Sequence, residues 1–86
     1  MNNINLHIEK TEDLLNKYKN ILNIELKNCE NDLVSYEIRE SLVKLERKEN
    51  RFNKLKYNLL NKYNKKESES LKRIYKYLKR NLDVWH

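Results

Sequence analysis

Glycine and proline are absent from this 86-residue chain, as are alanine and glutamine. Glycine and proline form most tight turns, and glycine builds the loops that cradle phosphates. Their absence argues against β-hairpins and against a nucleotide-binding loop. The length leaves room for one small domain, since domains typically run to about 100–200 residues. The first prediction is therefore a single all-α domain spanning residues 1–86.

Cysteine and long apolar runs are also scarce. Cys29 is the one cysteine, so an internal disulfide and the C-x-x-C motifs of zinc and redox sites are excluded. No apolar run approaches the roughly 18 residues of a transmembrane helix, and the first nine residues do not resemble a signal peptide. These features lead us to expect a soluble protein in a reducing, intracellular compartment.

Apolar residues recur at steps of three and four along the first third of the chain. At about 100° per residue the members of this stripe fall within an arc of about 80°, which predicts a helix of about eight turns. The stripe consists of Ile4, Ile8, Thr11, Leu15, Tyr18, Leu22, Leu26, Cys29 and Leu33. A second stripe, interrupted at Glu49 and Lys56, consists of Ile38, Leu42, Leu45, Phe52, Leu55, Leu59 and Tyr63. A third consists of Leu71, Ile74, Tyr75, Leu78, Leu82 and Trp85.

Two breaks separate these stripes. The second stripe does not continue the phase of the first. The boundary falls near residues 31–35, where Asn28, Asn31 and Asp32 supply capping and turn chemistry. Asn64, followed three residues later by Glu67, resembles a capping box, although Ser68 or Ser70 could cap instead. We therefore expect an antiparallel three-helix bundle with helices at about 3–31, 34–64 and 68–84. The alternative is a two-helix coiled-coil hairpin whose long second helix runs from about residue 35 to 84.

Charge is distributed unevenly between the two halves of the chain. The overall charge is +6, but residues 1–43 carry a net −3 and residues 44–86 a net +9. Either the halves complement each other within the fold or the basic half meets an external polyanion. Part of this lysine content reflects codon usage, because 42 of the 86 residues are Phe, Tyr, Met, Ile, Asn or Lys, as expected from an AT-rich genome.

Basic residues of the second half form a rail at steps typical of one helix face. The rail consists of Lys44, Arg47, Arg51, Lys54, Lys62 and Lys65, with Asn58 filling the gap. It lies roughly 100–180° from the apolar stripe of the same helix, so it should face solvent, an acidic partner or nucleic acid. Tyr36, Val43 and Tyr57 form a ladder beside it. Tyr57 could stack on bases, or a wide apolar face of the middle helix could absorb Val43 and Tyr57.

Several apolar residues do not fit a single helix contact. Leu14 and Ile21 lie to the side of the first stripe, where a second neighbouring helix could cover them. Leu6 and Ile24 point away from that stripe, and Trp85 anchors the C-terminal one, which makes these three the candidate partner interface. Alternatively, Trp85 could belong to a basic amphipathic helix that binds a membrane surface. The basic residues of that helix are Lys72, Arg73, Lys76, Lys79 and Arg80.

Catalytic and metal-binding chemistry is poorly represented. Cys29 belongs to the buried stripe, and His7 and His86 are the only imidazoles, so no nucleophilic triad can be assembled. We expect no enzyme activity, no metal, no cofactor and no small-molecule substrate. The favoured function is a helical interaction or structural subunit of a larger intracellular assembly, with a protein partner or a second copy of the chain. The alternative is a small basic accessory protein that binds nucleic acid through the rail.

Overall fold

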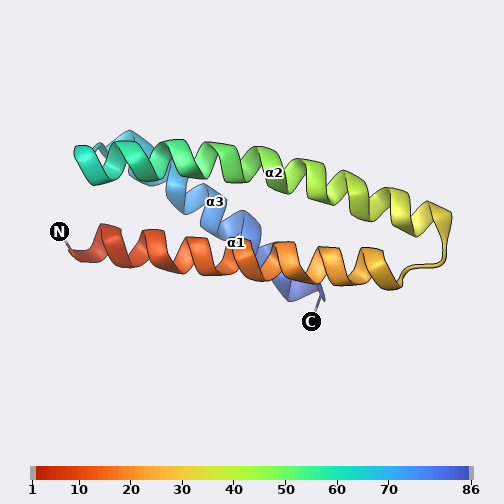
Figure 1. The fold of residues 1–86 in the computed structure, drawn as a ribbon. Helices are drawn as coiled ribbons and strands as arrows, with labels where there is room; N and C mark the ends of the chain where they lie inside the picture. The colour runs from red at the N-terminus through yellow and green to blue at the C-terminus, as the bar shows by residue number, and fades with distance from the viewer. Residues whose placement is uncertain (1, 86) are drawn as a thin grey trace.

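The computed structural model describes the backbone of residues 2–85 and the side chains of residues 3–84. This part of the chain forms three α-helices, α1 (Asn2–Asn28), α2 (Asp32–Asn61) and α3 (Lys65–Trp85). The helices run up, down and up, and each packs against the other two (Figure 1). The predicted three-helix bundle is confirmed. The alternative of one long second helix is wrong, because the backbone becomes extended at Lys62.

Asparagine side chains determine where α2 and α3 begin. Asn31 Oδ1 accepts hydrogen bonds from the amides of Leu33 and Val34, at 2.9 and 3.2 Å. Asn64 Oδ1 accepts from the amides of Lys66 and Glu67 at the same two distances. These bonds satisfy amides of the first turn that have no partner within the helix. α3 therefore begins before the predicted residue 68, because Asn64 is its cap and Ser68 is buried inside the helix.

The three apolar stripes meet in one core. Thr11 is buried among the apolar residues because its hydroxyl donates to the carbonyl of His7 at 2.8 Å. Between α1 and α3, the Tyr18 hydroxyl donates to Asn81 Oδ1 at 3.5 Å. The core consists of Ile8, Leu15, Tyr18, Leu22, Ile38, Leu45, Phe52, Leu55, Leu59, Leu71, Ile74, Leu78 and Leu82. Each fully buried leucine contributes about 1.5–3 kcal/mol relative to an exposed one.

The bundle is elongated, and α3 is its shortest helix. The principal extents are 46 × 21 × 15 Å. At about 1.5 Å per residue α3 is about 31 Å long and α2 about 45 Å, so the end of the α1–α2 hairpin extends past α3 (Figure 1). Leu33 lies at this end and is 68% exposed. The prediction that Leu33 continues the apolar stripe of the first helix was wrong, because α1 ends at Asn28. None of the helices described is long and apolar enough to cross a membrane.

Candidate polyanion-binding surface

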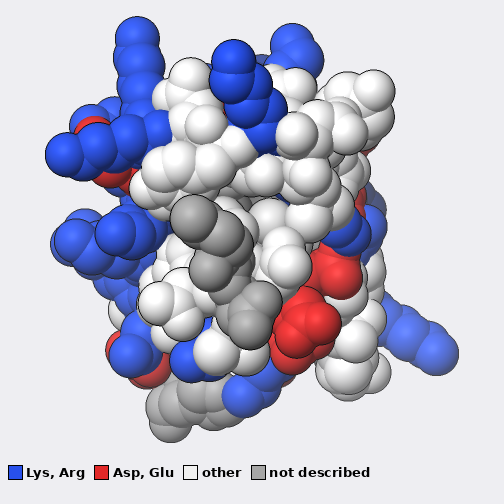
Figure 2. All heavy atoms as spheres, turned by 90° about the vertical axis from the view of Figure 1, so that its left-hand side faces the viewer, with Lys and Arg blue, Asp and Glu red and all other residues white. Residues whose placement is uncertain are grey.

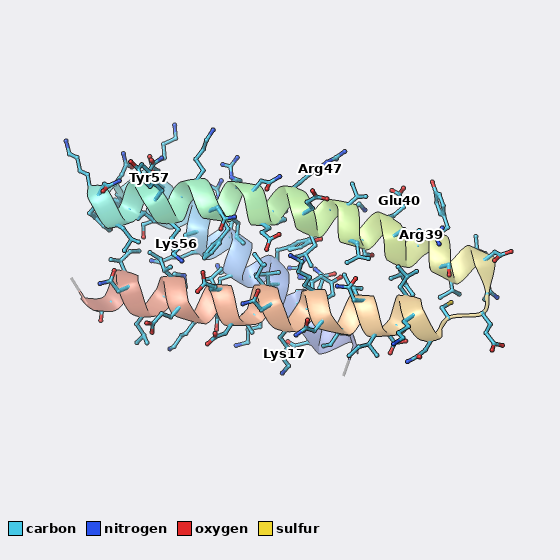
Figure 3. All side chains as sticks on the ribbon, viewed as in Figure 1. Lys17, Arg39, Glu40, Arg47, Lys56 and Tyr57 are labelled. Carbon is cyan, nitrogen blue, oxygen red and sulfur yellow. The ribbon has the colours of Figure 1, made fainter. Side chains whose placement is uncertain are left out.

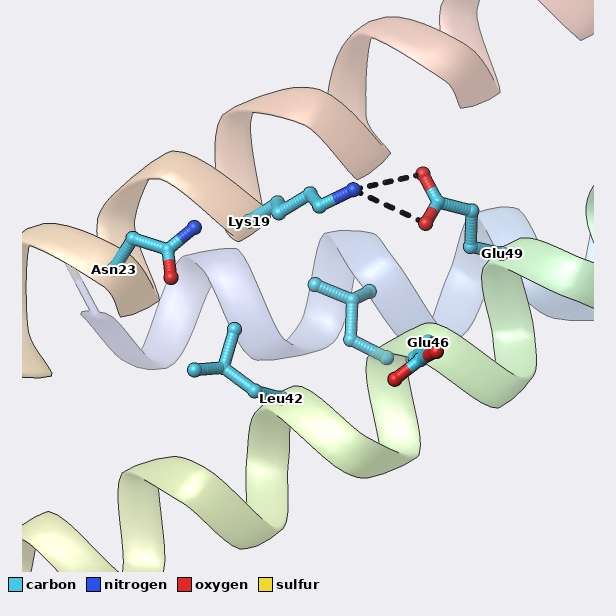
Figure 4. A pocket seen from close by; sticks show the side chains of 6 residues that line it. Lys19, Asn23, Leu42, Glu46 and Glu49 are labelled. Carbon is cyan, nitrogen blue, oxygen red and sulfur yellow. Dashed lines mark hydrogen bonds and ion pairs between the residues drawn. The ribbon is translucent and has the colours of Figure 1, made fainter.

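Two ion pairs connect α1 to α2, and they explain the interruptions of the second apolar stripe. Lys19 Nζ donates to both carboxylate oxygens of Glu49, at 3.1 and 3.2 Å (Figure 4). Lys56 lies between α2 and α1 in Figure 3, and its Nζ is 2.8 Å from Glu12 Oε2. The two charged positions in the stripe are therefore partly buried bridges to the neighbouring helix. Sequence spacing could not identify them, because their partners are 30 and 44 residues away.

The basic rail is exposed, but it is not one continuous row on α2. Its four members Lys44, Arg47, Arg51 and Lys54 lie on the exposed side of the helix. Lys62 is the C-cap, with φ −155° and ψ 122°, and Lys65 opens α3. The prediction that one helix carries all six was wrong, because α2 ends at Asn61 and the helical phase is lost there.

A cation–π contact shows which flanks of α2 and α3 meet. Lys48 Nζ lies 5.1 Å from the centroid of the Tyr77 ring. Burial, with a smaller effect of neighbouring Tyr18, raises the pKa of Tyr77, so a neutral phenol ring faces the ammonium group. This contact fixes the line along which the rest of the two helices pack.

Further basic side chains lie one helical turn to either side of this contact. On α2 these are Lys44 and Arg51, and on α3 they are Arg80 and Arg73. Because α2 and α3 run antiparallel (Figure 1), Lys44 and Arg80 lie at about the same level along the bundle, and so do Arg51 and Arg73. We name this set the basic seam. It consists of Lys44, Lys48, Arg51, Arg73 and Arg80.

Among the described side chains, no carboxylate forms an ion pair with a member of the basic seam. Apart from half-buried Lys48, its members are exposed. Like charges one turn apart on a helix destabilise it by about 0.2–0.5 kcal/mol per pair. Glu40 and Glu69 lie four residues before Lys44 and Arg73 and offset part of this repulsion. A bound anion would relieve the remainder.

Lysines on the outer side of α3 extend this basic surface. They are Lys72, Lys76 and Lys79, all exposed. Figure 2 shows many Lys and Arg side chains along its left-hand edge, with some acidic atoms among them, and a patch of acidic side chains right of centre with further basic ones beside it. The exposed residues of α1 are mixed in charge, with Glu9 and Asp13 beside Lys10 and Lys17. The outer side of α3 is therefore more basic than the exposed face of α1.

Aromatic residues beside the rail remain in solvent. Tyr57 is 69% exposed and Val43 45% exposed, so the expectation that the apolar face of the middle helix absorbs them was wrong. The reason is that α1 and α3 both contact the opposite side of α2, and Tyr57 points away from α1 (Figure 3). Tyr36, at the other end of the ladder, is also exposed.

The candidate partner interface on α1 is exposed but divided. Leu6 is 49% exposed and Ile24 57% exposed, while Leu14 and Ile21 pack against the core from the side. Leu6 and Ile24 are 18 residues apart, which corresponds to about 27 Å along a helix, so they do not form one apolar patch. The side chain of Trp85, the third member of the predicted interface, lies outside the described residues.

His7 is the histidine whose surroundings the structure describes. Its ring centroid lies 5.1 Å from that of Tyr75 on α3, and its Nε2 is buried without a hydrogen-bond partner among the described residues. Burial lowers the pKa of His7, and the charges of Lys72 and Lys10 lower it further. The neutral imidazole is therefore the form that fits the folded bundle.

The predicted bundle placed the middle helix against two neighbours, but the sequence interpretation did not identify the basic seam. It offered the basic residues at 72–80 as an alternative membrane surface and omitted Lys48, because periodicity on one helix does not show which flank meets a neighbour. The +9 charge of residues 44–86 was the available signal, since both helices of the seam belong to that half. Comparisons with protein-family models, with curated proteins and with solved structures found no match to this chain.

Proposed function

We propose that the protein is a non-enzymatic helical interaction module that binds an extended polyanion through the basic seam. The observation that carries the proposal is the alignment of Lys44 and Arg51 with Arg80 and Arg73 along two antiparallel helices, with no ion pair to any of them among the described residues. Surface lysines on one helix are ordinary. Basic side chains at matching levels of two neighbouring antiparallel helices are a more specific arrangement for a row of negative charges.

The energetics favour a ligand that carries many charges over a single anion. An exposed pair of opposite charges contributes only about 0.2–1 kcal/mol, so one anion on the seam would bind weakly. A polymer with regularly spaced charges contacts several side chains at once and releases its own condensed counterions. The exposed lysines of α3 extend the same surface beyond the seam.

Membership of a larger intracellular assembly is part of this proposal. The single cysteine supports a reducing compartment, where nucleic acids and acidic proteins are abundant. A protein partner is the second candidate, and the exposed apolar side chains at the free end of the α1–α2 hairpin favour it. These are Leu33, Val34 and Tyr36.

The test uses inorganic polyphosphate, a polyanion without bases. We expect the wild-type protein to bind it at low salt, and the variant Lys44→Gln/Arg51→Gln/Arg73→Gln to bind at least tenfold more weakly. The matched control is Lys10→Gln/Lys17→Gln/Lys27→Gln, which removes the same charge from exposed positions of α1 and should keep most of the affinity. Failure of the wild type to bind, or equal losses in both variants, contradicts the proposal.

A further inference from the structure

An open hollow lies where α2 ends and α3 begins, at one end of the basic seam. It has a volume of about 510 Å³, and its lining includes Tyr57, Asn58, Lys62, Tyr63 and Glu67. Asn58 lies seven residues beyond Arg51 on α2, which is about 10 Å along the helix axis. Lys66, which is exposed, lies seven residues before Arg73 on α3. The hollow therefore continues the line of the seam.

The hollow differs from the seam by its aromatic and amide groups. Tyr57 and Tyr63 are 69% and 56% exposed, so their rings are available to a ligand. Asn58 and Asn61 also line the hollow, and the amide of each can both donate and accept hydrogen bonds. The oxygen of Asn64, a further lining residue, is occupied as the cap of α3. Such a set suits a flat, polar, aromatic group better than a phosphate.

One carboxylate oxygen in the hollow lacks a donor. Glu67 Oε2 is buried and has no hydrogen-bond partner among the described residues. A buried acceptor without a donor is uncommon, because leaving it unpaired costs free energy. A carboxylate beside a phosphate-binding surface would repel the backbone of a nucleic acid. An amino group such as cytosine N4 is a suitable donor to this oxygen once the Glu67 side chain turns toward the hollow that it lines.

We propose that the polyanion is single-stranded nucleic acid, whose backbone follows the basic seam and one of whose unpaired bases enters the hollow against Tyr57 and Tyr63. This inference rests on the proposed function and names its ligand. Bases within a duplex are already stacked on one another, whereas an unpaired base offers its face to an aromatic side chain. Lys54 lies three residues before Tyr57 on the exposed side of α2, within reach of a phosphate beside the stacked base.

The experiment compares two ligands of equal charge. One is an oligodeoxycytidylate of about 15 nucleotides, and the other is an abasic oligomer of the same length. We expect the wild type to bind the cytidylate more tightly. We expect Tyr57→Ala and Tyr63→Ala to weaken cytidylate binding by about five- to hundredfold, the range of base–aromatic stacking. Neither variant should change the affinity for the abasic oligomer or for polyphosphate.

Two further variants serve as controls. Tyr57→Phe keeps the ring and should retain cytidylate binding. Tyr36→Ala removes an equally exposed tyrosine far from the hollow and should have no effect. Equal binding of the two oligomers, or an unchanged affinity in both tyrosine-to-alanine variants, overturns the base-binding inference. If the wild type still binds polyphosphate in that case, the proposed function stands. Tighter binding of duplex than of single-stranded DNA also overturns it, and loss of polyphosphate binding by the wild type overturns both.

Discussion

Lys19 of α1 and Glu49 of α2 are joined by hydrogen bonds of 3.1 and 3.2 Å, and the second bridge, Glu12 to Lys56, lies seven residues away on each helix. Both helices carry the glutamate first and the lysine second. An antiparallel arrangement therefore pairs opposite charges at both positions. A parallel arrangement, or a slip of seven residues, would bring lysine toward lysine or glutamate toward glutamate. The order of these four charges thus favours the observed direction and register.

This relationship predicts a measurable coupling between Lys19 and Glu49. Lys19→Glu and Glu49→Lys should each destabilise the bundle, because each creates a like-charged pair. The double variant should recover most of the loss. Exposed and partly exposed pairs contribute about 0.2–1 kcal/mol, and each single reversal also adds a repulsion, so we expect a coupling of at least that size from urea unfolding of the four proteins. Additive effects of the two substitutions would show that the bridge has no role in stability.

The asparagine caps give a second prediction. Asn31→Ala and Asn64→Ala should each lower the free energy of unfolding by about 0.5–2 kcal/mol, because each leaves two amides of a first turn without an acceptor. Asn53→Ala, at an exposed position inside α2, is the matched control and should be neutral or slightly stabilising. A cap variant as stable as this control would show that solvent replaces the cap at no cost.

Acid should destabilise the bundle through His7. Its folded pKa is lowered from 6.5, mainly by burial and then by Lys72 and Lys10, so the unfolded chain binds the proton more readily. The stability that the neutral ring provides is complete above pH 6.5 and is lost as the pH falls from there through the lower folded pKa.

Comparison with His7→Gln isolates this effect, because His86 is retained in both proteins. Urea unfolding at a series of pH values should show a steeper loss for the wild type than for the variant just below pH 6.5. Parallel stability curves for the two proteins would mean that protonating His7 is as easy in the folded state as in the unfolded one.

Replacing the exposed apolar residues of α1 should have almost no effect on stability, unlike the substitutions above. Leu6→Ser with Ile24→Ser should change the free energy of unfolding by no more than about 0.5 kcal/mol per site. Leu22→Ala, at a fully buried position, should cost about 2–5 kcal/mol. Sedimentation at high concentration then tests the proposed interface: if Leu6 and Ile24 contact a second copy, the double variant stays monomeric where the wild type associates. Identical sedimentation would leave them as isolated exposed residues.

The core could be predicted from the sequence because it is encoded locally, and for the same reason the caps could be narrowed to a few candidates at each break. Ile8, Leu22 and Leu71 recur at helical spacing within their own segments, and Asn31 and Asn64 stand at the breaks between those segments. Such features require only the geometry of one helix, which is the same in every protein.

The arrangement of the surface was harder to predict from the sequence, because it depends on how the helices pack against one another. In the sequence, Glu49 only interrupts an apolar stripe. The structure shows its partner to be Lys19, which lies 30 residues earlier. The exposure of Tyr57 depends on the direction from which α1 and α3 approach α2. Arg51 and Arg73 come to the same level because α2 and α3 pack through the shared core, with Lys48 on Tyr77 beside it, and no periodicity within one helix contains this pairing.

The salt dependence of binding tests most directly the claim that the basic seam holds a polyanion. For a single strand, log affinity should fall linearly with log salt concentration, by about 0.7 for each phosphate contact. Replacing Lys44, Arg51 and Arg73 with glutamine should reduce the slope for the oligodeoxycytidylate by about 2, if each side chain contacts one phosphate. The α1 variant lacking Lys10, Lys17 and Lys27 should keep nearly the wild-type slope. Parallel lines for the wild type and the seam variant, or an equal reduction in the α1 variant, would contradict the account.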